Sequence, residues 1–412
     1  MNLPPLPNLR VKVVAEANPW DDRDALPTLS PVGVCLLSLI CVACAVYPAV
    51  ATLYPSFWWL PVLLSAIFYL RANRTFHGWL LLVVSFLLGT TFGGAAAGAT
   101  VICIISTVAL TAFLYTTTRH PLLICLPIVA YAITAVLSSD MLTALFSLPC
   151  FPAAYILGRK IMQNEGRVSA ICSSALVLGG VSLFLAALLW RLSGTEMSFD
   201  ALSAAVSELH AKLLDLALHD ESFALLRMQF EGTEIPLADV LSQLFTLVLL
   251  LSPGIIVIVF LAIAYAAQYL CVMSYPSMGM KQFCTLVARR FIMSIPSALI
   301  FVACSLIALF FFSASKITVF LAVSQNLWLI LFPGMLIVGA WSLYSSYCVR
   351  PSPLYLVLAL VAALFMPPIF LIFVALTGAT TTLTRPLLLR IAAIMKAQNG
   401  DHDDKSGDGS SH

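Results

Sequence analysis

The sequence predicts an all-α fold: a polytopic α-helical integral membrane protein with about 11–12 transmembrane helices. Two observations lead to this prediction. The chain of 412 residues is 61% hydrophobic and only 10% charged, whereas soluble domains carry about 25% charged residues. The charges are also sorted along the chain. Nine apolar runs contain no Lys, Arg, Asp or Glu, at 25–70, 75–118, 120–139, 141–158, 168–190, 240–280, 291–315, 317–349 and 351–384.

The lengths of these runs set the expected helices. A helix needs about 20 residues to cross the hydrocarbon core, and three runs of 41 to 46 residues exceed that length. We expect 25–70 and 75–118 to form helical hairpins, and 240–280 to form one long helix and an uncharged turn. The predicted helices are 32–54, 57–70, 78–93, 96–117, 121–138, 141–157, 168–190, 242–270, 292–313 and 317–345.

The last run, 351–384, has two possible structures. It crosses the membrane once, or it forms a broken pair of helices around Pro367-Pro368. Adjacent prolines remove backbone donors and disfavour a straight helix.

Small residues cluster in the second run, at Gly89, Gly93, Gly94 and Gly98. Gly94 and Gly98 have the G-x-x-x-G spacing that lets two helices approach closely. Because run 75–118 must also turn somewhere, the same glycines suit a tight hairpin. Both interpretations give these residues a packing role rather than a ligand-binding one.

Basic residues in the short gaps between runs predict the orientation. If the N-terminus is cytoplasmic, five gaps with bases all fall inside, as expected for short cytoplasmic loops. These bases are Arg71, Arg74, Arg119, Arg159, Lys160, Arg167, Lys281, Arg289, Arg290 and Arg350. The basic tail that follows Arg385 then also lies inside, which requires 351–384 to cross twice or re-enter. Arg289 and Arg290 are in addition a candidate docking site for a partner protein.

The long gap 191–239 then lies outside the cell, and it holds nine acids and three bases. Its apolar residues recur at steps of three and four, which predicts an amphipathic helix. The predicted stripe is Phe199, Leu202, Val206, Leu209, Leu213 and Leu216. We expect this helix to lie on the outer membrane surface or on the helix ends. A lid over a binding cavity is the alternative.

These features divide the chain into five regions. They are a cytoplasmic tail (1–30), a first transmembrane block (31–190), an extracytoplasmic acidic insert (191–241), a second transmembrane block (242–392) and a polar C-terminal tail (393–412).

The sequence contains no recognisable catalytic set. It has neither an H-E-x-x-H zinc helix nor a G-x-S-x-G turn, and the phosphate-binding G-x-x-x-x-G-K-[ST] loop is missing. We therefore expect no enzyme activity, no cofactor, no metal site and no ATPase of its own. Cys41 and Cys44 have C-x-x-C spacing inside an apolar run, where small hydrophobic packing residues are the favoured interpretation and a redox or metal pair the alternative. Basic clusters are too small for a nucleic-acid partner.

Neutral amides are the candidate substrate-binding residues: Gln243, Gln325 and Asn326. An amide facing lipid leaves hydrogen-bonding groups unmet, so each should face a wet cavity or another helix. Hydrogen bonding between helices is the alternative to ligand contact. Pro253-Gly254 and Pro333-Gly334 are predicted helix breaks, which free backbone groups as in the broken helices of transporters.

Five segments together resemble the uncharacterised YybS-like family of bacterial multi-pass membrane proteins. They are Gly89 to Gly98, Tyr155-Ile-Leu-Gly-Arg-Lys160, Ser252-Pro253-Gly254, Asn326 to Gly334 with Gly339, and Leu376-Thr-Gly378 with Arg385. The family is distantly similar to the S components of energy-coupling-factor transporters. This resemblance implies a solute-binding unit in a bacterial cell membrane, docked on a partner that hydrolyses ATP. The chain departs from the family by having more helices, and by Ala379-Thr-Thr-Thr382 where an acidic residue is expected.

The predicted function is therefore a transporter-like membrane component that binds a small or lipidic solute without its own ATPase. The alternative is a non-transporting membrane scaffold that binds partner proteins. The expected partners are the lipid bilayer, an unidentified solute and other membrane proteins. A mid-depth cavity lined by Gln243, Gln325 or Asn326 would favour solute binding, and solid packing there would favour the scaffold.

Overall fold

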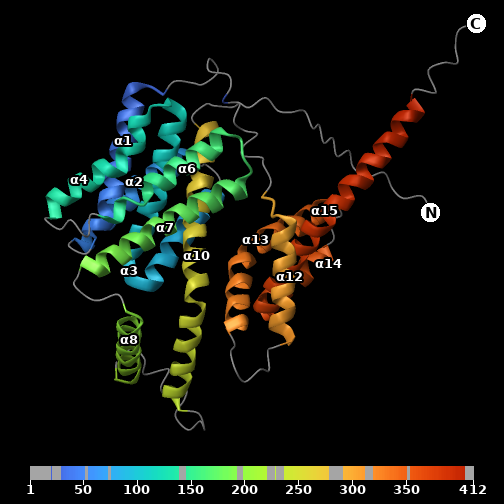
Figure 1. The fold of residues 1–412 in the computed structure, drawn as a ribbon. Coiled ribbons are helices and arrows are strands. Elements are labelled where there is room, and N and C mark those ends of the chain that lie inside the picture. The colour runs from blue at the N-terminus through green and yellow to red at the C-terminus, as the bar shows by residue number, and fades with distance from the viewer. Residues whose placement is uncertain are drawn as a thin grey trace, which may run out of the picture. The chain divides into compact units, whose positions relative to one another are not determined.

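The computed structural model describes residues 20, 29–51, 54–72, 76–138, 145–192, 198–219, 228, 236–277, 291–310, 319–349 and 353–403. All regular structure within these ranges is helical (Figure 1). Six of the described helices are long and apolar enough to cross a membrane, and three shorter helices are apolar as well. An all-α, polytopic membrane protein is therefore the correct fold class.

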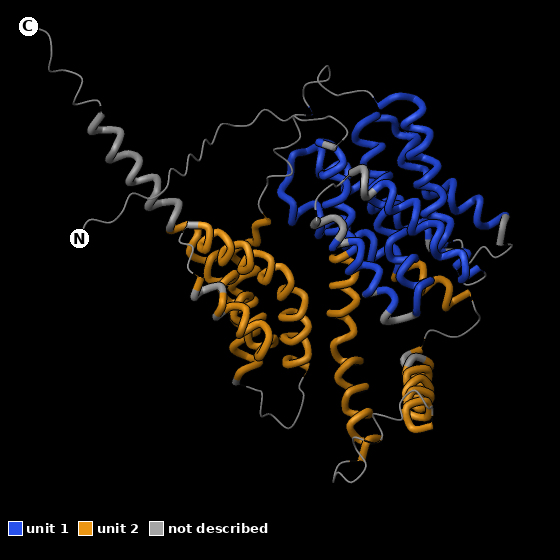
Figure 2. The backbone as a smooth tube through the Cα atoms, turned by 180° about the vertical axis from the view of Figure 1, so that it is seen from behind, with its two compact units in different colours: residues 1–182, 263–289 blue, residues 183–262, 290–412 orange. Residues whose placement is uncertain are grey.

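The chain forms two compact units (Figure 2). Unit 1 comprises Met1–Ser182 and Ile263–Arg289, and unit 2 comprises Leu183–Ala262 and Arg290–His412. This division differs from the predicted blocks because α10 (Leu237–Ser277) contributes to both units. Its second half carries small and apolar residues that are buried within unit 1, among them Ala267 and Leu270.

Unit 1 contains the first six α-helices that the structure describes, the last of them up to Ser182. They and the short 3₁₀ turns are α1 (Pro31–Val50), η1 (Pro55–Phe57), α2 (Trp59–Ala72), α3 (Phe76–Thr118), η2 (Pro121–Cys125), α4 (Leu126–Ser138), η3 (Leu145–Ser147), α6 (Cys150–Met162) and α7 (Arg167–Leu192). The Ser30 hydroxyl caps α1 by accepting a hydrogen bond from the Gly33 N–H (3.1 Å). Run 25–70 thus forms two helices joined through Pro55, in agreement with the predicted hairpin.

The chain of α3 folds back on itself at its glycines. Gly94 has a φ of +74°, a left-handed conformation that glycine adopts without strain. A Cβ on Gly89 would lie 2.5 Å from the Cα of Gly98, whereas residues nine apart in a straight helix are separated by about 13 Å. Gly89 and Gly98 therefore form the contact of a tight hairpin, and Gly93 lies within the same helix beside the reversal.

The interior of unit 1 contains small polar side chains that pair with one another. The Ser106 hydroxyl donates to the Ser65 hydroxyl (3.0 Å), and the Cys44 thiol lies 3.4 Å from the same oxygen. Cys41 pairs in the same way with Thr111 (3.2 Å). These contacts join α1, α2 and α3. They favour a packing role for Cys41 and Cys44, and no described group of three or more His, Cys, Asp or Glu is arranged to hold a metal.

Unit 2 contains α8 (Phe199–His219), the first part of α10, α12 (Ile295–Phe310), α13 (Val319–Val349), α14 (Pro353–Phe365) and α15 (Pro367–Asp403). The predicted turn in 240–280 is absent up to Ser277, because α10 continues as one helix of 41 residues. At about 60 Å it exceeds a bilayer with its headgroups. Helix α14 ends at Phe365 and α15 begins at Pro367, with Met366 between them outside both helices. Run 351–384 therefore contains the broken pair of helices.

Helices α12, α13 and α15 pack around one apolar cluster: Ala298, Phe301, Met335, Ala375 and Ala379, all fully buried. The Trp328 indole on α13 donates to the Ser305 hydroxyl on α12 (3.0 Å). The closest approach is between α13 and α15, where a Cβ at Gly339 would overlap the carbonyl oxygen of Val374. A Cβ at Gly378 would overlap the carbonyl oxygen of Met335 in the same way.

The predicted outer helix corresponds to α8. The side of α8 that packs against other residues does not include part of the predicted stripe. The His210 ring stacks on the Phe245 ring of α10 at 4.6 Å, and Ala217 on the same side is buried. Leu209, Leu213 and Leu216 remain exposed. The side of α8 that carries His210 and Ala217 is therefore packed, whereas these three leucines of the predicted stripe are not.

Candidate solute site at the break in α10

The Ser252-Pro253-Gly254 segment interrupts the hydrogen bonds of α10 without ending the helix. Proline has no N–H, so the carbonyl of Leu249 loses its usual partner four residues later. The Ser252 hydroxyl donates to this carbonyl instead (2.7 Å). The predicted break is thus a local substitution of hydrogen bonds inside a continuous helix.

Asn326 of α13 reaches the same break from the neighbouring helix. Its side-chain oxygen accepts a hydrogen bond from the Gly254 N–H (2.7 Å). Its amide nitrogen donates to the carbonyls of Leu250 and Ala322, both at 2.9 Å. A side chain at Gly254 would collide with Asn326, because a Cβ there would lie 2.7 Å from that oxygen. Backbone groups therefore occupy both ends of the Asn326 amide, which favours the interhelical role over the ligand role.

A groove lies between α10 and α13 beside this contact. We call it the α10–α13 groove, and its volume is about 460 Å³. It is lined by Leu250, Pro253, Val319, Ala322, Val323, Asn326, Leu327 and Ile330. Ligand sites commonly measure about 300–1,000 Å³. Seven of these eight side chains are apolar, so the groove can bind hydrocarbon but offers few hydrogen bonds.

The three predicted amides do not converge on one cavity. Gln243 is exposed on α10, outside the residues that line the groove. Gln325 is half-buried next to Asn326, and its side-chain oxygen is buried with no hydrogen-bond partner in the described structure. Only Asn326 lines the groove. A single helix places residues 325 and 326 about 100° apart, so neighbours in sequence face different surroundings.

The other residues predicted for a site either take part in helix packing or lie outside the described residues. Pro333 is inside α13, which continues through it. Gly334 leaves room for the side chain of Met293, which precedes α12, since a Cβ at Gly334 would lie 2.9 Å from the Met293 methyl group. Arg289 and Arg290, the predicted docking pair, lie outside the described residues.

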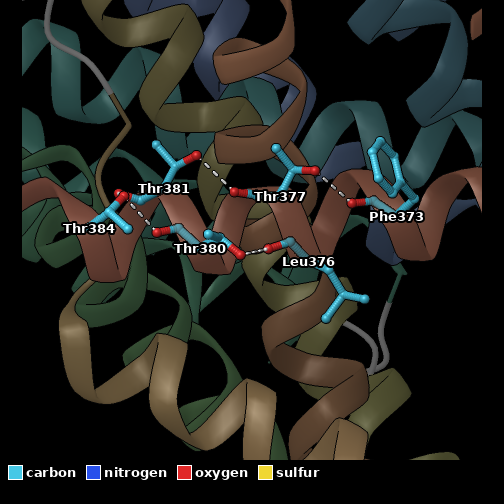
Figure 3. A pocket seen from close by; sticks show the side chains of 6 residues that line it. All are labelled: Phe373, Leu376, Thr377, Thr380, Thr381 and Thr384. Carbon is cyan, nitrogen blue, oxygen red and sulfur yellow. Dashed lines mark hydrogen bonds between the residues drawn. The ribbon is translucent and has the colours of Figure 1, made fainter.

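A second hollow, of about 370 Å³, lies along α15 and was missed from the sequence (Figure 3). It is lined by Phe373, Leu376, Thr377, Thr380, Thr381 and Thr384. The four threonine hydroxyls each donate to a carbonyl of their own helix three or four residues earlier. The T-x-x-T-T-x-x-T spacing was the available signal. Because the donors are occupied, this surface is only weakly polar.

Comparison with known proteins provides no assignment for this geometry. No family model matches the chain, and neither the curated proteins nor the solved structures contain a match. The resemblance to the YybS-like family therefore stays a prediction from the sequence.

Proposed function

We propose that this chain is a transporter-like membrane component that binds a small or lipidic solute and has no ATPase of its own. The observation that supports this proposal is the α10–α13 groove. Both helices that form it are candidate membrane spans, so its lining residues Val323 and Leu327 face a hydrocarbon environment. The groove lies at the altered hydrogen bonds around Pro253, the kind of position at which broken-helix transporters bind their solutes.

The proposed orientation is supported by contacts inside unit 1. Arg119 donates a hydrogen bond to the carbonyl of Trp20. One turn before Arg119, the Thr116 hydroxyl lies 2.6 Å from that of Tyr275, at the end of α10. A Cβ at Gly158, beside Arg159, would touch Tyr115 at 2.9 Å. Trp20, Arg119 and the helix ends at Gly158 and Tyr275, which precede two further predicted cytoplasmic gaps, therefore lie at one end of unit 1, as one shared side requires.

The turn between α6 and α7 belongs to this same end. Lys160 lies 2.7 Å from Glu165, and the hydrogen bond from Lys160 holds the pKa of that carboxyl below its ordinary value. The pair contributes only modestly because exposed ion pairs are screened by water. Arg159 remains exposed and leaves positive charge on the proposed cytoplasmic surface.

The proposed cytoplasmic C-terminal tail is supported by the direction of α15. Gly339 of α13 lies against Gly378 of α15, and three residues further along both helices Thr381 donates to Ser342 (3.1 Å). Contacts that advance together along two helices mean that the helices run in the same direction. Arg385 and the C-terminal end of α13 then lie toward the same end of unit 2, which favours two crossings by run 351–384.

A thermal-shift screen of the purified full chain tests the function. Phospholipids, fatty acids and water-soluble vitamins should be tried, and we expect at least one amphiphile to raise the unfolding temperature. Filling the groove with Val323→Trp should remove that shift. No stabilising ligand, together with co-purification of a stable protein partner, would contradict solute binding.

The scaffold alternative is supported by one specific feature, the exposed leucines of α8. Leu209, Leu213 and Leu216 form an apolar edge beside the charged pair of Glu208 and Lys212. Cysteine labelling tests which side this edge occupies. An impermeant thiol reagent should label a cysteine at Asp215 in intact cells and should leave one at Lys281 unlabelled. The opposite pattern would invert the proposed topology.

A further inference from the structure

The chemistry of the α10–α13 groove restricts its occupant. Asn326 is the one amide in the lining, and backbone groups of Leu250, Gly254 and Ala322 occupy it. The remaining lining side chains are hydrocarbon. A solute headgroup placed here would lose its hydration without gaining hydrogen bonds, at a cost of several kcal/mol. The occupant is therefore apolar along its whole length inside the groove.

The length of the groove restricts the occupant further. The lining on α13 extends from Val319, in the first turn of the helix, to Ile330. Eleven steps of 1.5 Å give a length of about 16 Å. One leaflet of a bilayer is about 15 Å of hydrocarbon, half of the total core. The groove therefore begins in the first turn of α13 and has about the length of one leaflet.

We infer that the α10–α13 groove holds one acyl chain of a bilayer phospholipid, with the headgroup at the level of Val319. This inference rests on the proposed function and names its ligand class. The predicted orientation assigns the lipid to the outer leaflet, because α13 begins on the extracytoplasmic side.

The position of Pro253 gives the bound chain a consequence for α10. Pro253 lines the groove, and the hydrogen bonds of Ser252 and Asn326 surround it. A chain in the groove contacts α10 where its own hydrogen-bond ladder is interrupted and where bending is easiest.

Photocrosslinking in vesicles tests the inference. The full-length protein is reconstituted into phosphatidylcholine vesicles that contain a phosphatidylcholine with a diazirine along one acyl chain. We expect crosslinks on the segments 250–253 and 319–330. Val323→Trp, which fills the groove, should lower the yield on these segments at least fivefold. Leu327→Trp should do the same, in case the first variant folds poorly.

The matched control is Val259→Trp. Val259 is also an exposed valine, but it lies nine residues beyond Leu250, which is two and a half turns and so the opposite side of α10. Its substitution should leave the groove crosslinks unchanged. An equal yield in wild type and Val323→Trp would overturn the inference. Disulfide-linked dimers from Val323→Cys would also overturn it, since a second copy would then cover the groove.

A parallel arm uses a diazirine fatty acid in place of the phospholipid. If only the free fatty acid labels the groove, the inference fails on the source of the chain. If nothing labels the groove but a solute still shifts the unfolding temperature and Val323→Trp removes the shift, the acyl-chain inference fails while the proposed function stands. If both labelling and shift are absent, both fail.

Discussion

The α3 span of unit 1 and the α13 span of unit 2 are both apolar enough to cross a membrane, yet they have opposite surroundings. In the most apolar 18 residues of Gly94–Thr118, 78% of the residues are buried, whereas the corresponding value for Val319–Cys348 is 11%. The buried side chains of α3 include Ser106, Thr107 and Thr111. Hydropathy therefore identifies both segments as membrane helices but does not indicate which of them faces protein.

The two spans also pack by different means. In α3, hydroxyls at Ser106 and Thr111 pair with Ser65 of α2 and Cys41 of α1. In α13, close backbone contact is concentrated at Gly339, against Gly378. Unit 1 thus encloses its central helix, whereas unit 2 leaves a large part of its span free for lipid. The α10–α13 groove lies on that free surface.

The largest expected effect follows from the concentrated contact in unit 2. Gly339→Ala and Gly378→Ala should each destabilise the protein by about 3 kcal/mol, because the added Cβ meets backbone atoms that cannot rotate away. Gly180→Ala is the matched control on α7, where a Cβ meets nothing within 4 Å. Unfolding of the purified protein in detergent measures the difference. Equal stability of Gly339→Ala and Gly180→Ala would show that the helices do not cross there.

A neighbouring pair of amides on α13 gives the next largest effect. Asn326→Leu removes the acceptor of the Gly254 N–H and the donor to the carbonyls of Leu250 and Ala322, and it should cost about 1–2 kcal/mol. Gln325→Leu should be neutral or stabilising, since its side-chain oxygen has no hydrogen-bond partner among the described residues. Thermal unfolding of both variants under one detergent condition checks this contrast. If Gln325→Leu cost as much as Asn326→Leu, the distinction between the two residues would be wrong.

At the reversal in α3, we expect the preference for glycine at position 94 to come from its backbone conformation rather than from steric contact with neighbouring atoms. A Cβ at Gly94 meets nothing within 4 Å, but the φ of +74° disfavours other residues. Gly94→Ala should cost about 1 kcal/mol. Gly94→Asn should cost less, because asparagine tolerates this conformation better. Chemical unfolding of the two variants gives the comparison, and a larger cost for Asn would point to steric contact instead.

The smallest effect is expected from the hydroxyl contact at the end of unit 1. Tyr275→Phe removes the partner of Thr116, whose hydroxyl still donates to the carbonyls of Ala112 and Phe113. Because the Thr116 hydroxyl keeps these hydrogen bonds, the free energy of unfolding should fall by only about 0.5–1 kcal/mol. The shift in unfolding temperature measures it. Phe in place of Tyr should leave the ring contact with Phe113 unchanged, so a much larger loss would contradict this account.

The sequence predicted the parts of this structure that depend on local chemistry. Gaps with charges separated the helices, and the glycines from Gly89 to Gly98 predicted the hairpin in α3. The Pro367-Pro368 pair made the break before Pro367 one of the two structures expected for run 351–384. These signals act through nearby residues, so one short segment contains them completely.

Contacts between distant segments could not be predicted in the same way. In a membrane, apolar residues surround a helix on all sides, so their spacing does not indicate which face meets protein. The sequence therefore identified Asn326 as a polar residue needing a partner but not the backbone of Leu250 and Gly254 as that partner. The sharing of α10 between the units and the exposed leucines of α8 are likewise consequences of tertiary packing.

Labelling with a small lipid-soluble carbene precursor tests the central contrast most directly. The protein in vesicles is irradiated with the probe, and labelling of each residue is measured by peptide mass spectrometry. We predict strong labelling of Phe320 and Trp341, which are exposed on α13 outside the groove, and almost none of Ile102, Ile105 and Val108 in α3. Labelling of the α3 residues as strong as that of α13 would contradict an enclosed unit 1 and a lipid-facing unit 2.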